Sequence, residues 1–269
     1  MICLQINNKL AYLLGLYFVS LSFNCFAKQP HTIYFLEDFT PYIYSDEKQQ
    51  PSGLLAEIAL KALAESGVEY KLIPNNVKRL FKEIKKGGNV STLGVYKTPE
   101  RESWSIMSPE LYRPPQPVLI VKRSKLQQVP TPLTIKALKK QLDNQTLTGV
   151  IMKDYSYGNW FDGVLETELN QIPRYQLGMQ RAFKMVASPL RADFTLAYPA
   201  QARYLIEQDS TFQDKLSLVP FSNVPPNDTG AYWMFSKDSD PVLIKKIENA
   251  MEKVRQSDFY KQTVKKYTE

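Results

Sequence analysis

The chain has 269 residues, of which 43% are hydrophobic, 12% aromatic and 23% charged, and this balance excludes an intrinsically disordered or fibrous protein. Lysine and arginine outnumber aspartate and glutamate by 34 to 27, yet they are scattered rather than gathered into a basic arm, so we expect no nucleic-acid partner. A chain of this length usually divides its core between two domains.

The N-terminus has the pattern of a secretory signal peptide. Residues 10–23 form an apolar run of 14, shorter than the roughly 20 residues that a membrane span needs and typical of a signal-peptide core. Cys25 and Ala27 provide small residues at positions −3 and −1 of a cleavage site, so we expect residues 1–27 to be removed. The alternative is a lipid anchor on Cys25, which the bulky residues before it disfavour.

Few side chains for covalent or metal chemistry remain after that cleavage. Cys3 and Cys25 both lie in the leader, and His31 is the single histidine of the sequence. The remaining chain therefore lacks thiols, histidine-based zinc sites and a Ser-His-Asp triad, which excludes most hydrolases and metalloenzymes. We expect no metal and no cofactor. We interpret His31, close to the new N-terminus, as a solvated side chain without a catalytic role.

Strands alternate with helices from residue 32 onward. The spacing of apolar residues and the positions of glycine predict a strand at 32–36, a helix at 52–67, a strand at 69–73, a helix at 77–86 and a strand at 90–95. Strands separated by helices pair in parallel through right-handed crossovers, which indicates an α/β lobe.

A second series with the same alternation predicts a second lobe. It comprises a strand at 118–121, a helix near 132–142, a strand at 149–152, a helix from about Asn159 and a strand at 192–197, and residues 241–267 are helical in spacing. Pro114-Pro115 precedes the series and Pro225-Pro226 follows it, and each pair requires extended backbone. From the residues alone, these pairs are either stiff surface loops or crossings between lobes.

Five segments resemble one known family in the same order along the chain. The stretch VSTLGVYKTPERESWSIMSPELY at 90–112 is similar to the strand, loop and helix start of the bacterial extracellular solute-binding proteins of family 3. The other four are FTPYIYSDEKQQPSGLLAEIALKAL at 39–63, RADFTLAYP at 191–199, YWMFSKDSDPVLIKKIENAMEKV at 232–254 and FYKQTVKKY at 259–267. Together they span nearly all of the chain beyond the leader.

The resemblance implies an α/β, two-lobed periplasmic-binding-protein type II fold with a discontinuous first lobe and two hinge crossings. We expect lobe 1 to comprise residues 28–114 and 231–269, lobe 2 to comprise 115–230, and the proline pairs to lie in the crossings. The resemblance also implies a periplasmic, monomeric protein whose partners are a small-molecule ligand and the membrane permease of an ABC transporter.

Arg101 is the first candidate for ligand binding. Thr98-Pro99-Glu100 is a helix start on physical grounds, since threonine caps, proline suits the first position and glutamate complements the dipole. A guanidinium is disfavoured at that end and needs a counter-anion. In the resembled family, the matching arginine holds the ligand's carboxylate in a bidentate bridge. The alternative is a structural ion pair with Glu37, Asp38 or Glu102.

The family pattern marks further candidates around Arg101. Gly94, Val95 and Tyr96 would offer backbone groups and one side chain, while Phe39, Tyr42 and Tyr44 would stack on a flat ligand or belong to the core, the better interpretation for Phe39. In the second lobe, the amides of the 153–158 loop, which includes Tyr155, Ser156 and Tyr157, would face an anion at a helix N-terminus or form an ordinary polar loop. Tyr198 replaces the acidic residue that holds the ligand's ammonium in α-amino-acid binders, which disfavours a standard α-amino acid.

We therefore expect a binding protein that delivers a small carboxylate-bearing solute to a transporter, without catalytic residues. One alternative is a sensing protein that presents its ligand to a membrane receptor. Another is an enzyme similar to cyclohexadienyl dehydratase, in which Glu37, Asp38, Lys153 or Asp154 would act as acid or base. Nothing in the spacing of these residues requires catalysis.

Overall fold

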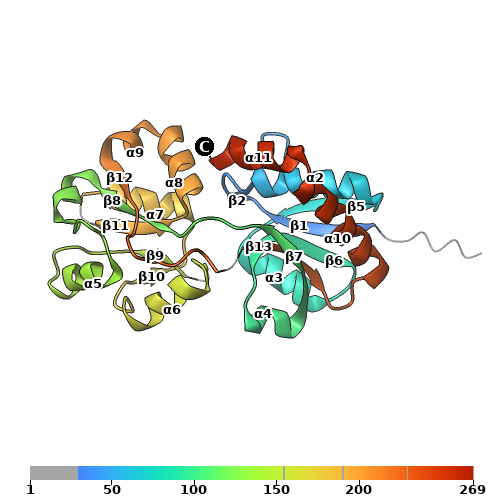
Figure 1. Ribbon diagram of the computed structural model, residues 1–269, viewed down its shortest axis with the longest axis horizontal. Helices are drawn as coiled ribbons and strands as arrows, with labels where there is room; N and C mark the ends of the chain where they lie inside the picture. The colour runs from blue at the N-terminus through green and yellow to red at the C-terminus, as the bar shows by residue number, and fades with distance from the viewer. Residues whose placement is uncertain (1–29, 154, 190, 229, 269) are drawn as a thin grey trace, which may run out of the picture.

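The computed structural model describes residues 30–153, 155–189, 191–228 and 230–268, which form two lobes side by side (Figure 1). The expected leader with its cleavage site, and Asp154, lie outside the described residues. Within the described ranges, no helix is both long and apolar enough to cross a membrane.

The first lobe is built on a five-stranded sheet with strand order β5-β1-β6-β13-β7. Its strands are β1 (His31–Leu36), β5 (Tyr70–Asn75), β6 (Val90–Tyr96), β7 (Ser105–Tyr112) and β13 (Ala231–Ser236). The predicted parallel pairing is confirmed for β1, which lies parallel to both β5 and β6. The last strand, β13, returns from the far end of the chain and lies antiparallel between β6 and β7. This lobe is therefore discontinuous in sequence.

Helices cover both faces of this sheet because its strands alternate buried side chains. Ile33 and Phe35 face the same core as α2 and α10, while Tyr34 and Leu36 pack toward α3. The helices are α2 (Leu54–Ser66), α10 (Pro241–Gln256) and α11 (Asp258–Thr268) on one side, and α3 (Val77–Lys86) and α4 (Pro99–Trp104) on the other (Figure 1). A small sheet of β2 (Asp38–Phe39), β3 (Ile43–Ser45) and β4 (Pro51–Ser52) adjoins them.

The second lobe differs from the predicted copy of the first. Its central strand β8 (Val118–Lys122) lies antiparallel to both β11 (Phe194–Ala197) and β12 (Leu216–Val219), because β8 enters directly from the first lobe rather than through a helical crossover. In the described part of this lobe, parallel pairing is restricted to β9 (Ile151–Met152) with β10 (Arg174–Tyr175) and a bridge between Gly149 and Phe194. The surrounding helices are η1 (Arg123–Gln128), α5 (Ile135–Asp143), α6 (Asn159–Thr167), α7 (Met179–Ala187), α8 (Pro199–Gln208) and α9 (Ser210–Lys215).

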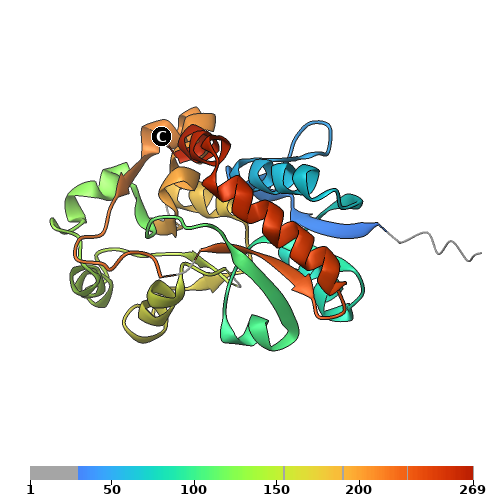
Figure 2. The same ribbon diagram turned by 45° about the vertical axis from the view of Figure 1, so that its right-hand side comes forward.

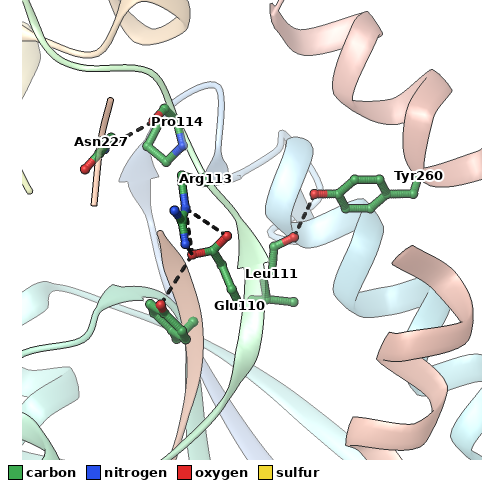
Figure 3. Close-up of polar contacts among 7 residues, drawn as sticks. Glu110, Leu111, Arg113, Pro114, Asn227 and Tyr260 are labelled. Atoms are coloured by element: carbon green, nitrogen blue, oxygen red, sulfur yellow. Dashed lines mark hydrogen bonds and ion pairs between the residues drawn. The ribbon is translucent and has the colours of Figure 1, made fainter. Parts of the chain in front are cut away.

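Two chain segments connect the lobes, one between β7 and β8 and one between β12 and β13, and each contains a proline pair. The two segments are hydrogen-bonded to each other. Asn227 Nδ2 donates to the Pro114 carbonyl oxygen at 3.2 Å (Figure 3), and Gln116 Nε2 donates to the Pro225 carbonyl oxygen at 3.0 Å. On the first-lobe side, Glu110 pairs with Arg113 at 2.8 Å, and the Tyr260 hydroxyl donates to the Leu111 carbonyl at 3.0 Å (Figure 3).

The C-terminal helix also touches the second lobe. After α10, which runs along the first lobe, α11 turns toward α8 (Figure 2). Arg203 on α8 donates from Nη2 to the Thr268 carbonyl, and the ring of Tyr44 lies 6.2 Å from that of Tyr204. The lobes therefore meet at a second place besides the crossings.

The interpretation of His31 as a solvated side chain is wrong. Its side chain is fully buried, because β1 begins at this residue and places it beside β6. One ring nitrogen lies 2.7 Å from Ser91 Oγ, the other lies 3.1 Å from Asn89 Oδ1, and the ring packs on Phe235. Burial lowers the pKa of His31, so the imidazole is held neutral.

Candidate functional site

An aromatic cluster fills the contact between the lobes, and we call it the interlobe aromatic cluster. Its members are Phe39, Tyr42, Tyr96 and Tyr112 of the first lobe and Tyr155, Tyr157 and Tyr198 of the second. Three contacts cross between the lobes: Phe39 to Tyr155 at 6.0 Å, Tyr42 to Tyr198 at 6.4 Å and Tyr96 to Tyr198 at 5.8 Å between ring centroids. These distances and the tilted or edge-on angles are typical of favourable aromatic pairs.

The fold places these rings where α/β proteins usually bind ligands. Tyr96 is the last residue of β6, Tyr198 directly follows β11, and Tyr155 and Tyr157 lie in the loop after β9. Ligands of α/β sheets bind outside the carboxyl ends of the strands, where the following loops converge. The cluster therefore occupies the expected position of a binding cleft. The core interpretation of Phe39 is also correct in part, since its side chain is buried while it touches the opposite lobe.

The hydroxyls of this cluster are neutral hydrogen-bonding groups. Burial raises the pKa of Tyr42, Tyr96, Tyr155 and Tyr198 well above the usual tyrosine value, and raises that of Tyr112 to about 12. Two of these hydroxyls donate hydrogen bonds within the protein. Tyr198 donates to the Ser156 carbonyl at 3.2 Å, and Tyr155 donates to Gln201 Oε1 at 3.2 Å.

Arg101 lies beside this cluster and is held by neutral groups. Its Nη1 donates to the Tyr96 carbonyl oxygen at 2.7 Å, and its guanidinium carbon lies 4.8 Å from the centroid of the Phe81 ring. Thr98 caps the short helix α4 by accepting from the Arg101 amide at 3.2 Å, as predicted. Burial lowers the pKa of Arg101, although the guanidinium stays charged at neutral pH.

None of the proposed structural ion pairs of Arg101 is present among the described side chains. Glu102 instead pairs with Lys97 at 2.7 Å, and Glu37 is exposed. The side chain of Asp38 lies outside the described part of the structure. Arg101 therefore carries a partly buried charge that contacts a carbonyl and a ring, with no carboxylate within ion-pair distance in the described ranges.

Asp162 is a site residue that the sequence did not indicate. It lies in the first turn of α6 and accepts hydrogen bonds from Ser156 Oγ and from the Tyr157 amide, the latter at 2.8 Å. Burial raises its pKa, and its charge acts on Arg101 across the lobe contact. A carboxylate held by two hydrogen bonds on one lobe thus acts electrostatically on the guanidinium of the other. The only sequence signal was an acidic residue near a helix start, which is common in any helix.

Some backbone amides of the loop before α6 are already hydrogen-bonded to nearby side chains. The Tyr157 amide binds Asp162, and the Gly158 amide donates to Ser156 Oγ at 3.3 Å, so these two amides are used within the loop. Gly158 has φ of 98°, and a Cβ there would lie 2.6 Å from Asn227 Oδ1, so a side chain has no room. Asn227, which is buried, thereby joins α6 to the crossing between the lobes.

Three other predicted residues lie at the margin of the cluster. Gly94 has φ of 76° and packs against Leu55, and the buried side chain of Val95 belongs to the core under α3. Tyr44 faces α8 through Tyr204 rather than the cluster. Of the candidate acid–base residues for an enzyme, Lys153 and Glu37 are exposed.

The sequence matches the family of bacterial extracellular solute-binding proteins, family 3, over residues 32–269. The chain belongs to this family. A comparison of this solute-binding protein with curated proteins finds no match.

Solved structures with the same fold support this assignment. A periplasmic binding protein of Salmonella typhimurium described as highly specific for arginine has a TM-score of 0.69 at 16% identity, with 89% of this chain and 99% of that chain covered. An ancestral amino-acid-binding protein described as a precursor of cyclohexadienyl dehydratase has a TM-score of 0.69 at 17% identity, covering 91% and 97%.

A sensor domain of a histidine kinase is similar to the same extent. Its TM-score is 0.69 at 14% identity, with 89% of this chain and 96% of that domain covered. At these identities the likeness establishes the fold. The solute-binding protein has the predicted two-lobed, type II periplasmic-binding-protein fold.

Proposed function

We propose that this solute-binding protein captures a small carboxylate-bearing solute between its lobes in the periplasm and presents it to the permease of an ABC transporter. The observation that carries the proposal is Arg101. Its guanidinium is partly buried at the lobe contact and bonded only to the Tyr96 carbonyl among the described residues, which leaves its planar fork with donors for an anion. The surrounding rings would cover the flat faces of the bound solute.

We propose the boundaries of the two lobes on the same basis. Lobe 1 would comprise residues 28–114 and 231–269, and lobe 2 would comprise 115–230, so that both proline pairs fall in or next to the crossings. Few residues would then change backbone angles when the lobes open, as in other hinged proteins. A ligand bound to both lobes would stabilise the closed arrangement by mass action, and the closed shape is what a permease would recognise.

The ligand in this proposal is an anion rather than a standard α-amino acid. Tyr198 carries no charge, and its hydroxyl is already bonded to the Ser156 carbonyl. It would leave a buried ammonium without compensation. Asp162 is a carboxylate that acts on Tyr96 and Tyr198 of the cluster, but it already accepts hydrogen bonds from Ser156 and Tyr157.

Native mass spectrometry of protein purified from its own periplasm would weigh the bound solute directly. We expect a small acid on the wild type and none on Arg101→Gln, with Arg113→Gln as the control because Arg113 pairs with Glu110 outside the cluster. In parallel, titration calorimetry with glutamate, glutamine, arginine, lysine and histidine should give weak or no binding. Undiminished solute on Arg101→Gln, or submicromolar affinity for one of these amino acids, would contradict the proposal.

A sensing role is the second candidate, because a histidine-kinase sensor domain is among the similar structures. Both roles use the same closing lobes, so the closing motion does not distinguish them. Genes for a permease and an ATPase beside this one would favour transport.

The similar ancestral structure also motivates a test for catalysis. Mass spectrometry of the co-purifying acid after prolonged incubation should recover it unchanged, since we propose no acid–base group in the cluster.

A further inference from the structure

The hydroxyl of Tyr42 is a buried polar group at the contact between the lobes. Its side chain is 2% exposed and packs on Phe39, Tyr112 and Tyr198 with centroid distances of 5.1, 5.9 and 6.4 Å. Within the described residues, its hydroxyl is buried and has no hydrogen-bond partner. Buried hydroxyls are almost always bonded, because leaving one unpaired costs the full loss of its hydration. The hydroxyl therefore needs an explanation that packing does not give.

Packing alone would be served by phenylalanine, which has the same ring. The backbone around Tyr42 is also fixed without the hydroxyl. The Tyr42 amide donates to the Phe39 carbonyl at 2.9 Å, and the Leu55 amide donates to the Tyr42 carbonyl at 2.7 Å. The ring is thus held in place at the start of α2, and its hydroxyl is presented at the lobe contact in a preorganised position.

The surroundings of this hydroxyl differ from those of Arg101. The Tyr42 ring packs on Phe39, Tyr112 and Tyr198, whereas the Arg101 guanidinium contacts the Tyr96 carbonyl oxygen and the Phe81 ring. Burial raises the pKa of Tyr42, so the hydroxyl keeps its proton and can donate. The lobe contact therefore contains two separate polar positions, one a guanidinium and one a phenol.

We propose that the Tyr42 hydroxyl donates a hydrogen bond to an uncharged oxygen of the ligand, at a distance from the carboxylate that Arg101 binds. This inference rests on the proposed function. The second oxygen is uncharged because the rings packed on Tyr42 are neutral, and Arg203, the cation that acts on Tyr42, is exposed and donates to the Thr268 carbonyl. The aromatic walls favour a flat body between the two groups. The ligand class is thus a flat carboxylic acid with a remote keto, ether or hydroxyl oxygen.

Three rigid probes of one shape test this class by titration calorimetry. They are 4-acetylbenzoate, which has a remote acceptor, 4-isopropylbenzoate, which has none, and 4-(aminomethyl)benzoate, which has a cationic donor. The wild type should bind the acetyl compound most tightly. Tyr42→Phe should bind it about tenfold more weakly, as loss of one buried hydrogen bond implies, with the isopropyl compound unchanged. The control Tyr34→Phe, on the opposite face of the sheet, should match the wild type.

The stability of the unliganded variant gives an independent readout. Tyr42→Phe should melt at the wild-type temperature or above it, because it removes an unpaired buried hydroxyl. A lower melting temperature would mean that the hydroxyl has a structural partner, and would overturn the proposal. Equal binding of the acetyl compound by the wild type and Tyr42→Phe, or binding of none of the three probes by the wild type, would also overturn it.

The same probes test the role of Arg101 separately from that of Tyr42. Arg101→Gln should lose all three, since each has a carboxylate. If Arg101→Gln keeps them while Tyr42→Phe loses the acetyl compound, the anion site of the proposed function is wrong and the Tyr42 contact stands. If Arg101→Gln loses all three while Tyr42→Phe loses none, the proposed function stands and the Tyr42 contact is wrong.

Discussion

His31 illustrates how burial changes the behaviour of a single residue. In the first strand it is neutral, and Ser91 Oγ accepts a hydrogen bond from Trp233 as well as facing the imidazole. A proton added to this ring would be placed in the core, far from water. The unfolded chain has no such restriction, so it binds the proton more readily.

We predict that the protein loses stability as the pH falls below the usual histidine pKa of about 6.5. The folded-state pKa is lowered, so the contribution of His31 is present above the unfolded pKa and is lost as the pH falls toward the folded one. Urea unfolding at pH 7.5 and pH 5 measures this. His31→Asn should be less stable at pH 7.5 but show a smaller difference between the two pH values. The same pH dependence in both proteins would contradict the prediction.

Arg101 and Tyr198 show which single residues the sequence can mark as candidates. Arg101 is a predicted ligand residue because a cation at a helix start conflicts with the helix dipole, and this conflict is visible in the sequence. The missing charge at Tyr198 was equally visible from the family pattern. Asp162 and Asn227 were not found, since their importance arises from neighbours that lie 61 and 113 residues away in the chain, Arg101 and Pro114.

At the scale of elements, local signals placed most helices correctly. The predicted helix at 52–67 forms as α2, which ends at Ser66 because Gly67 adopts the left-handed conformation with φ of 64°. The predicted start at Thr98 forms α4. The strand β7 was not anticipated, because Pro109 and several polar residues interrupt its alternation and only pairing with β13 makes it a strand.

We predict that Thr98→Ala lowers the free energy of unfolding by about 1 kcal/mol, the usual cost of losing an N-cap. The Thr98 side chain caps the N-terminus of α4, and that helix has six residues. The affinity for the bound acid should fall as well, since Arg101 lies in the same turn. Thr98→Ser keeps the accepting oxygen and should differ from the wild type by a few tenths of a kcal/mol in denaturant unfolding. Equal stability of the alanine and serine variants would refute this role of the cap.

At the scale of the whole molecule, the two crossings are linked to each other by hydrogen bonds. Asn227 is buried between the first crossing, the start of α6 and the interlobe aromatic cluster. Gln116, which is half-buried, links the same two segments through a hydrogen bond that is exposed to solvent. A hydrogen bond that is buried costs more to break than one that water can replace.

We predict that Asn227→Ala shifts the protein toward a more open arrangement of the lobes, because the buried Pro114 carbonyl loses its donor at a cost of about 1 to 3 kcal/mol. Small-angle X-ray scattering of the unliganded protein should show a larger radius of gyration. Gln116→Ala, the matched control, should leave it unchanged. If both variants scatter like the wild type, Asn227 does not hold the lobes together.

The sequence by itself determined the alternation of strands and helices, the caps and glycine ends, and the extended backbone at the two proline pairs. All of these depend on residues close together in the chain, where periodicity and backbone preferences act. Only the tertiary structure decided that His31 is buried, that β8 pairs antiparallel and that phenols from both lobes surround Tyr42. Those features depend on which distant segments lie side by side, and burial and pairing across such distances leave no local signal in the chain.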